Sequence, residues 1–382
     1  MDQVHVALSG VGGYARLHIN ELLSDTGKRR VKLVGAVDPY PSGNGYARLL
    51  EEGVPVYTSL PELYEHHSPV LSILSCPTPY HAEQAVYCLE RGSHVLVEKP
   101  IAPSVEAAET MIRARDASKR TLVVGYQWCF NDTMNALRDG IRSGRYGAPK
   151  TLRAIVLWPR DQNYYNRGIG WAGKRYAADN REAFDNVASN ATAHYLMNML
   201  WMAGCGENGV VIAGVEASAF RANSIETYDS ICLSLTLSNG ARIVFAASHT
   251  VGHHEVQHPM FSYEFERATF SYGVKGGQGD QIHLTTEDGA TAVFGSAAIG
   301  AAEQSKIWKT LDIIDKRIPN LCPPELAIWH TRALALADKA VADSIRVFSP
   351  DEINVDGSLL WVPGVADTLF DFYNGVRPLY RC

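Results

Sequence analysis

One lysine stands at the end of a short apolar run, in the sequence Val97-Glu98-Lys99-Pro100. A lysine ammonium donates hydrogen bonds to a hydroxyl, stabilises a developing alkoxide, or acts as a base when burial lowers its pKa. Pro100 restricts the backbone directly after the lysine. If the run is a strand of a parallel sheet, Lys99 lies at the edge where such sheets bind ligands. Lys99 is therefore predicted to be catalytic and to bind substrate; the alternative is an exposed loop lysine.

A glycine-rich segment follows the first apolar run, in the order Gly10-Val11-Gly12-Gly13-Tyr14-Ala15. Gly10 permits a tight turn, Gly12 lets the backbone approach a pyrophosphate, and Ala15 lets a helix pack closely on the strand. The phosphates would lie at the amino end of that helix, where free N–H groups and the helix dipole favour an anion. The pattern predicts a dinucleotide site; the alternative is a simple turn.

An acidic residue, Asp38, ends the second apolar run. A carboxylate at this position accepts hydrogen bonds from the ribose hydroxyls of an adenosine. It repels a 2′-phosphate, and no Arg or Lys follows before Arg48, so NAD is favoured over NADP. The spacing from the glycines is long, and residues Gly27–Arg30 are interpreted as a widened loop that accounts for it. The alternative is a surface Asp in the turn before Pro39.

These motifs together resemble the Gfo/Idh/MocA oxidoreductases, the relatives of glucose–fructose oxidoreductase and inositol dehydrogenase. The family's signature is matched by Glu98-Lys99-Pro100, and its two other nucleotide-edge segments are matched by residues 75–83 and 125–130. The resemblance covers the first half of the chain, reaches the helix near residue 194, and is weak beyond about residue 250. It implies an NAD site formed by Gly10, Gly12, Gly13, Tyr14, Ala15, Asp38, Cys76, Pro77, Thr78, His81, Glu98, Lys99 and Gln127.

The segment Asp185–Asn198 resembles the family's substrate-domain helix, which typically carries an Asp and, four residues later, a His. Residues four apart share one face of a helix. His194 is present in this chain, but the position of the Asp holds Asn190. An amide orients an imidazole but does not stabilise imidazolium as a carboxylate does. His194 is predicted to be catalytic; the missing Asp shifts weight towards Lys99 or towards a His194 that acts without a carboxylate partner, and a satisfied core histidine is the alternative.

An irregular segment between residues 161 and 181 is rich in aromatic and basic side chains. Long irregular segments in compact enzymes are usually binding loops. Aromatic faces suit the apolar faces of sugar rings, and the cations would also suit a carboxylate or phosphate. A solvated loop with some packing aromatics is the alternative. The predicted substrate-binding residues are Lys99, Trp158, Arg160, Trp171, Lys174, Asn190 and His194.

Two further patterns are predicted to carry no ligand. Four histidines, His249, His253, His254 and His258, cluster within ten residues, but their spacing matches no recognised zinc pattern, so no metal is expected. The glycine-rich run 273–279 lacks the spacing of a phosphate-binding loop and is interpreted as a turn.

The pattern of apolar runs that predicts the secondary structure changes near residue 130. Before it, apolar runs alternate with helical segments, which predicts a parallel, doubly wound sheet of the Rossmann type. After it come long apolar runs, and Ser238-Asn239-Gly240 predicts a hairpin with a primed turn. A helix is expected over about 186–203. The predicted class is α/β, with a Rossmann domain over 1–128 and an α+β domain with a large, mostly antiparallel sheet over 129–382.

Composition excludes several classes of protein. The chain has 382 residues and a formal charge of −6, which gives no reason to expect nucleic acid as a partner. No apolar stretch approaches the roughly 20 residues of a membrane span. Seven scattered cysteines without close pairs argue against a disulfide framework and favour a reducing compartment. A cytoplasmic location is expected.

The predicted function is hydride transfer between NAD and a secondary hydroxyl of a sugar, polyol or sugar derivative. Two alternatives stay open: an enzyme that oxidises a glycoside transiently and recycles its NAD, and a sensor that binds NAD or sugar without turnover. The resemblance also implies a homodimer or homotetramer.

Overall fold

The computed structural model describes residues 3–167, 170–277, 279–297 and 299–376, without side-chain detail for 299–304. The chain divides into two compact units, unit 1 (Met1–Phe130 and Gly300–Ile328) and unit 2 (Asn131–Ile299 and Trp329–Cys382). The predicted division at 128/129 placed everything after it in one domain, whereas residues 300–328 pack with unit 1. The reason is the helix α10 (Ile299–Ile314), which contributes buried side chains to unit 1, Ile307 and Leu311 among them.

Unit 1 is built on a six-stranded sheet in the order β3-β2-β1-β4-β5-β6. All neighbouring strands are parallel. The sequence order reverses between β1 and β4, which places a ligand-binding crevice at the carboxyl ends of the strands. Its strands are β1 (Val4–Ser9), β2 (Val31–Val37), β3 (Val56–Tyr57), β4 (Leu71–Leu74), β5 (His94–Val97) and β6 (Leu122–Val124).

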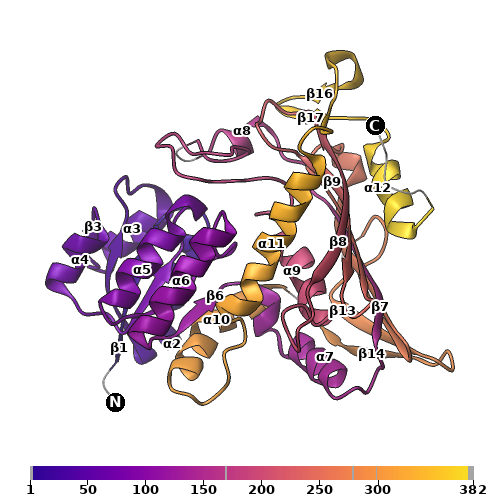
Figure 1. Ribbon diagram of the computed structural model, residues 1–382. Coiled ribbons are helices and arrows are strands. Elements are labelled where there is room, and N and C mark those ends of the chain that lie inside the picture. The colour runs from indigo at the N-terminus through magenta and orange to yellow at the C-terminus, as the bar shows by residue number, and fades with distance from the viewer. Residues whose placement is uncertain (1–2, 168–169, 278, 298, 377–382) are drawn as a thin grey trace. The chain divides into compact units, whose positions relative to one another are not determined.

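Helices cover this sheet, with α5 and α6 side by side across one face (Figure 1). The helices are α1 (Ala15–Leu22), α2 (Asp25–Arg30), α3 (Gly43–Glu51), α4 (Leu60–His66), α5 (His81–Glu90), α6 (Val105–Ser118) and α10, with short 3-10 turns at Thr78–Tyr80 and Gln127–Phe130. The interpretation of Gly27–Arg30 as a loop is wrong. Ser24 caps a helix there by accepting the Gly27 N–H, and three basic residues in its last turn favour it.

Unit 2 contains a nine-stranded sheet in the order β14-β13-β12-β11-β7-β10-β9-β8-β15. It is mostly antiparallel, as predicted, but β7 runs parallel to β10 and β8 runs parallel to β15. The strands are β7 (Pro149–Leu157), β8 (Ile212–Arg221), β9 (Ser230–Leu237), β10 (Arg242–Ser248), β11 (Gln257–Phe265), β12 (Ala268–Tyr272), β13 (Gln281–Thr286), β14 (Thr291–Ser296) and β15 (Arg346–Val347).

The central strands of unit 2 are buried on both faces, which explains their unbroken apolar sequences. One face packs on α12 (Val365–Asn374) through a cluster that includes Ile155, Val244 and Leu369. The other face packs on α9 (Ala193–Met202), as Figure 1 shows by the positions of the two helices. The remaining elements are α7 (Asp132–Arg142), α8 (Gln162–Tyr165), α11 (Pro324–Val341), which begins in unit 1, the 3-10 turns His253–Glu255 and Pro350–Glu352, and a hairpin of β16 (Asn354–Asp356) and β17 (Leu359–Trp361).

Two local predictions in unit 2 need correction. The hairpin between β9 and β10 is present, but only Gly240 of its turn has a positive φ, so the turn is not the primed type that requires two such residues. The helix predicted from about 186 begins at Ala193. Asn186 accepts the N–H groups of Ala188 and Ser189, and this local bonding replaces the helical pattern before Ala193.

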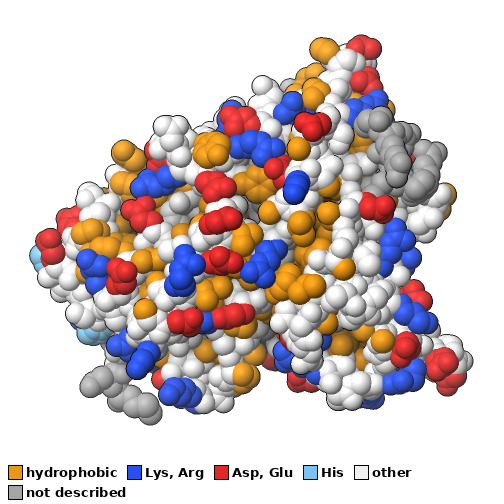
Figure 2. All heavy atoms as spheres, in the orientation of Figure 1, with side chains coloured by type: hydrophobic (Ala, Val, Ile, Leu, Met, Phe, Trp, Pro, Cys, Tyr) orange, Lys and Arg blue, Asp and Glu red, His pale blue; other side chains and the backbone are white. Residues whose placement is uncertain are grey.

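The surface carries both signs of charge. On the face seen in Figure 2, basic and acidic side chains alternate, and neither sign gathers into a large patch. Within the described ranges, no helix is long and apolar enough to cross a membrane. The six cysteines that these ranges include are free thiols, and Cys382 lies outside them.

Candidate functional site

The glycine-rich segment forms the turn between β1 and α1. Gly10 has a φ of +90°, and a Cβ there would lie 2.6 Å from the Ser75 carbonyl oxygen, so only glycine fits. Beside Gly12 the space is open, with no atom within 4 Å of a built Cβ. No side chain caps the amino end of α1 at Tyr14. An uncapped helix end with open space beside it fits a dinucleotide pyrophosphate.

Asp38 lies at the carboxyl end of β2, next to the same turn. Its Oδ2 accepts the N–H of Val11 at 3.1 Å, and its Oδ1 accepts the N–H of Tyr40 at 2.9 Å. These bonds hold the carboxylate against the glycine turn. Each oxygen has a second lone pair, so both can still accept a ribose hydroxyl. The acceptor oxygens of Asp38 are therefore placed to bind the adenosine ribose of NAD.

The other predicted cofactor residues follow β4, β5 and β6 at the same edge. His81 is buried, with Nε2 3.0 Å from the Cys76 carbonyl oxygen and Nδ1 2.8 Å from that of Pro100. The ring thus lies between the loops after β4 and β5, and burial lowers the pKa of His81. Thr78 and Gln127 are also buried, while Cys76, Pro77, Glu98 and Lys99 complete the edge.

Beneath Lys99, the carboxylate of Glu98 is buried in a group of three ionisable side chains. Its Oε1 accepts a hydrogen bond from His18 Nε2 at 2.8 Å and contacts the ammonium of Lys306. Burial alone would raise the pKa of Glu98, but the Lys306 cation and the His18 hydrogen bond outweigh it and hold that pKa well below its usual range. Burial lowers the pKa of His18. We call Glu98, His18 and Lys306 the buried charge group.

The buried charge group connects three parts of unit 1. Lys306 comes from α10 and also donates to the Tyr14 hydroxyl at 3.1 Å, directly after the glycine turn. Glu98 precedes Lys99, and its carboxylate packs against Gly125, where a Cβ would lie 3.0 Å from Oε2. The sequence analysis missed Lys306, which lies 208 residues from Glu98. The apolar spacing of Ile307, Leu311 and Ile314 could have indicated the helix but not the lysine's partner.

In unit 2, the parallel strands β7 and β10 end side by side. A second group of candidate residues follows these two strand ends. The Trp158 N–H donates to the Ser248 carbonyl at 2.9 Å, and the Arg160 N–H donates to that of His249 at 3.1 Å. His249 in turn lies with Nδ1 2.8 Å from the Trp158 carbonyl oxygen. Asp161 then caps α8 by accepting the Tyr164 N–H. This arrangement brings together residues about 90 positions apart.

Two arginines in this region lie against aromatic rings. The guanidinium of Arg160 is 5.2 Å from the ring centre of Tyr164 and 5.7 Å from that of Trp158. That of Arg167 is 3.5 Å from the ring centre of Tyr164 and 5.0 Å from that of Trp171. We call Trp158, Arg160, Tyr164, Arg167, Trp171 and His249 the arginine–aromatic cluster. The sequence analysis did not select Tyr164, Arg167 or His249 as site residues.

Of the other predicted substrate residues, Lys174 is engaged elsewhere in unit 2. Its ammonium pairs with Glu226 at 3.3 Å. Trp171 is nearly buried and packs with Ala177 and Ala183, so its ring serves as a platform for Arg167.

His194 is the second residue of α9, and Asn190 lies in the turns before that helix. The two residues therefore do not lie on the same helix, contrary to the prediction from the sequence. The Ala193 N–H contacts the Asn190 carbonyl oxygen at 3.4 Å, so Asn190 stays close to the helix start. Tyr195, next to His194, packs edge-on against Trp158 with ring centres 5.8 Å apart. This contact places the start of α9 beside the arginine–aromatic cluster.

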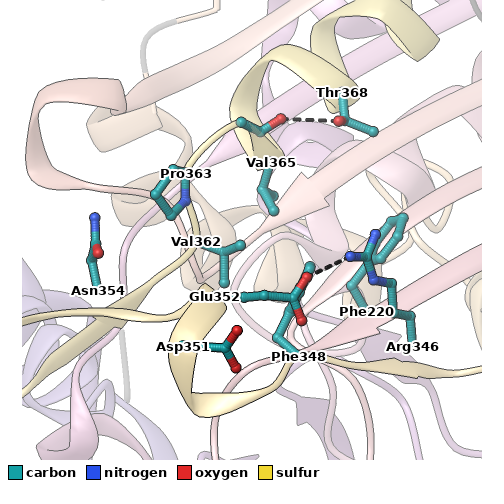
Figure 3. A pocket seen from close by; sticks show the side chains of 11 residues that line it. Phe220, Arg346, Phe348, Asp351, Glu352, Asn354, Val362, Pro363, Val365 and Thr368 are labelled. Atoms are coloured by element: carbon teal, nitrogen blue, oxygen red, sulfur yellow. Dashed lines mark hydrogen bonds and ion pairs between the residues drawn. The ribbon is translucent and has the colours of Figure 1, made fainter.

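Two hollows occur in unit 2. One, of about 450 Å³, includes Arg160 and Tyr164 of the arginine–aromatic cluster in its lining. The other, of about 480 Å³, contains none of the predicted site residues. Figure 3 shows the second hollow, where Arg346 points toward Glu352 and pairs with it at 2.6 Å. The lining of the first hollow also includes Asp161 and Asp356, but among the described residues Arg160 forms no ion pair, whereas Arg346 in the second hollow is paired.

The four histidines from His249 to His258 do not gather. His249 is buried in the arginine–aromatic cluster, whereas His254 packs edge-on against Trp361. In the ranges that the structure covers, no three His, Cys, Asp or Glu side chains are placed to hold a metal ion.

Comparison with known proteins supports the interpretation of unit 1. Residues 4–126 match the model of an oxidoreductase family with an NAD-binding Rossmann fold. An inositol 2-dehydrogenase from Rubrobacter xylanophilus is 27% identical over 161 residues, which cover 42% of this chain and 45% of the relative. A 1-carboxy-3-chloro-3,4-dihydroxycyclo hexa-1,5-diene dehydrogenase from Comamonas testosteroni is 27% identical over 172 residues, 44% of this chain and 43% of the relative. The chain thus spans less than half the length of these curated relatives.

Solved structures extend the likeness in fold over both units. The WlbA dehydrogenase from Bordetella pertussis, in complex with NADH and UDP-GlcNAcA, has a TM-score of 0.73 and 20% identity. The comparison covers 91% of this chain and 99% of that one. At this identity the likeness shows the fold alone.

Proposed function

Because residues 4–126 match the model of an oxidoreductase family with an NAD-binding Rossmann fold, we propose that this chain is an oxidoreductase of the Gfo/Idh/MocA type that transfers a hydride between NAD and a secondary hydroxyl of a sugar, polyol or sugar derivative. The observation that carries the proposal is the convergence at one sheet edge of the glycine turn, Asp38 and Lys99. The dehydrogenase names of the relatives support oxidation of a CH–OH group.

In this proposal the backbone of the glycine turn and the amino end of α1 bind the pyrophosphate, and Asp38 binds the adenosine ribose. The negative charge of Asp38 disfavours the 2′-phosphate of NADP. When bound, NAD supplies the hydride acceptor. Lys99 hydrogen-bonds the substrate hydroxyl. It accepts the hydroxyl proton as a neutral amine, or stabilises the developing alkoxide as an ammonium. Glu98 fixes the strand end that carries Lys99.

His194 is proposed as a second acid–base group, on the evidence of the family resemblance. Its partner position is an amide, so a protonated His194 lacks the carboxylate that would stabilise it. Lys99 therefore has the larger share of the proton chemistry in this chain. Assembly into a homodimer or homotetramer and a cytoplasmic location stay predictions from the sequence.

The test follows NADH formation at 340 nm while inositols, hexoses, sugar acids and glycosides are supplied with NAD. Wild-type protein is expected to form NADH with at least one class, and Lys99→Ala is expected to lose roughly 10²- to 10⁴-fold in rate. Lys32→Ala, an exposed lysine of the same unit, serves as the matched control and should retain activity. NAD binding without NADH from any compound would overturn the proposal in favour of a recycled cofactor or a sensor.

A further inference from the structure

The two arginines of the arginine–aromatic cluster have no ion-pair partner among the described residues. Neither Arg160 nor Arg167 lies within ion-pair distance of an Asp or Glu, and the Nε atom of Arg160 is buried without a hydrogen-bond partner. Both arginines are half-buried; a buried polar atom without a partner, such as the Arg160 Nε, costs free energy, so such atoms are normally paired. Lys174 and Arg175, a few residues further along, are paired with Glu226 and Asp338 respectively. Within this segment of the described chain, Arg160 and Arg167 thus differ from the two basic residues that follow them.

His249 adds a hydrogen-bond acceptor to the same cluster. Its side chain is almost fully buried, and its ring centre lies 5.5 Å from that of Tyr164. Because Nδ1 lies 2.8 Å from a carbonyl oxygen, Nδ1 must carry the proton. Burial and the cations of Arg160 and Arg167 lower the pKa of His249 to about 3, so the ring is neutral at pH 7. Its Nε2 is then an acceptor, and it is buried without a partner.

The carboxylates near the cluster are already engaged. Asp161 accepts the Tyr164 N–H and bonds from Asn163 and Ser358. Asp185 accepts the Gly173 N–H at 2.8 Å, and Asp229 accepts the N–H groups of Ala222 and Asn223. Among the described residues, the guanidinium groups of Arg160 and Arg167 are left without a carboxylate partner, and His249 Nε2 is left without a hydrogen-bond donor. This combination is complementary to an oxyanion that has a hydroxyl beside it.

We propose that Arg160 and Arg167 bind an anionic group of the substrate, a carboxylate or a phosphate, while His249 Nε2 accepts a hydrogen bond from a neighbouring hydroxyl. The stacked rings of Tyr164, Trp158 and Trp171 hold the guanidinium planes in place for bidentate bonds. Arg160 and Tyr164 also line a hollow of about 450 Å³, whose lining includes Asp161 and Asp356. The substrate class is thereby narrowed from sugars in general to sugar acids or sugar phosphates. This inference rests on the proposed function, because it takes the bound anion to be the substrate.

The test measures binding, so that it does not depend on turnover. Full-length protein with saturating NAD is titrated by calorimetry with D-glucuronate, D-glucose 6-phosphate, UDP-GlcNAcA and neutral D-glucose. At least one anion is expected to bind 10-fold or more tightly than D-glucose, and Arg160→Gln and Arg167→Gln are each expected to weaken that anion roughly 10- to 100-fold. Binding of D-glucuronate alone indicates a carboxylate site and binding of D-glucose 6-phosphate alone indicates a phosphate site, whereas UDP-GlcNAcA carries both groups. Arg346→Gln, at a paired arginine of the same unit, should leave the affinity unchanged.

Each outcome decides the inference. Equal affinity for neutral and anionic compounds, no anion binding in any arm, or unchanged anion affinity in both cluster variants would overturn it. NADH formation from neutral sugars with no anion preference would leave the proposed function standing and remove the inference. Anion binding that needs both arginines, without NADH from any compound, would keep the binding site and remove the hydride-transfer function.

Discussion

In unit 1 the carboxylate of Glu98 lies between Lys306 and His18, whereas in unit 2 the guanidinium groups of Arg160 and Arg167 lie against aromatic rings with no carboxylate partner in the described ranges. Both regions are close to strand ends and contain buried polar atoms. In the first, the partners are supplied by the chain itself. In the second, the chain supplies donors and one acceptor only. An internally paired charge holds a strand end in place, while an unpaired cation is available to a ligand.

A third region shows what burial does without a counter-charge. The carboxyl of Asp229, just before β9, is fully buried and accepts bonds only from neutral groups of Ala222 and Asn223. Burial raises the pKa of Asp229 to about 6, with these hydrogen bonds acting in the opposite direction. Glu98, equally buried, has its pKa lowered by a cation. For these two buried carboxyls, the presence or absence of a nearby cation therefore decides whether the pKa falls or rises.

The largest effect is expected from removing the cation of the buried charge group. Lys306→Met should lower the free energy of unfolding by about 3–5 kcal/mol, because Glu98 is left buried without its counter-charge. Urea denaturation followed by tryptophan fluorescence measures the loss. The double variant Glu98→Gln/Lys306→Met should recover much of it, since an amide needs no counter-charge. An unchanged stability in Lys306→Met would show that the pair does not hold unit 1 together.

The next effect is a pH dependence with opposite signs for the two buried carboxyls. Between pH 4 and 6 an unfolded Asp229, with a pKa near 3.8, has released the proton that the folded state retains, so stability falls as the pH rises. A pKa difference of about 2 units corresponds to about 3 kcal/mol. Glu98 contributes stability that is present above about pH 4.5 and is lost as the pH falls further.

Unfolding free energies from pH 2 to 7 check this, with Asp229→Asn as the comparison. The variant should lose the downward slope between pH 4 and 6 and keep the loss of stability at lower pH. Identical profiles for variant and wild type would contradict the assignment of a raised pKa to Asp229.

A smaller effect is expected at the unpaired arginine. Arg160→Met keeps an apolar side chain of similar length against Tyr164 and removes a cation that has no protein partner. The free energy of unfolding should change by less than about 1 kcal/mol, in contrast to Lys306→Met. The same urea experiment measures it. A loss as large as that of Lys306→Met would mean that Arg160 has a structural role and would remove the distinction between the two regions.

The smallest effect is expected at the exposed pair of Arg346 and Glu352. Glu352→Gln should leave the midpoint of thermal unfolding unchanged within error, because solvent screens the interaction. Differential scanning calorimetry provides the comparison. A clear decrease would show that pairing alone, without burial, stabilises this chain.

Much of unit 1 could be predicted because its signals are local. The apolar runs at Val4–Ser9 and His94–Val97 became strands, and the turn at Gly10 follows from its neighbours in sequence. The return of α10 was not predicted, because its place in unit 1 depends on contacts with residues about 200 positions earlier. No local pattern identifies Lys306 as the partner of Glu98.

In unit 2, the sequence indicated the segment but not which of its residues meet. Trp158, Arg160 and Trp171 lie in the arginine–aromatic cluster, whereas Lys174 pairs with Glu226, and the parallel strands β7 and β10 bring His249 to the same place. Both outcomes depend on which residues meet in space. The start of α9 was placed too early because an Asn side chain competes with helical bonding, a preference that periodicity does not reveal.

The most direct measurement of the central claim follows the hydride. The panel compound that yields NADH is prepared with deuterium at its carbinol carbon and incubated with the protein and unlabelled NAD, and the reduced cofactor is analysed by mass spectrometry. The account predicts one deuterium in each NADH formed, and none transferred by Lys99→Ala on the same timescale. Oxidised compound accompanied by NADH without deuterium, or conversion of the compound with no net NADH, would contradict it.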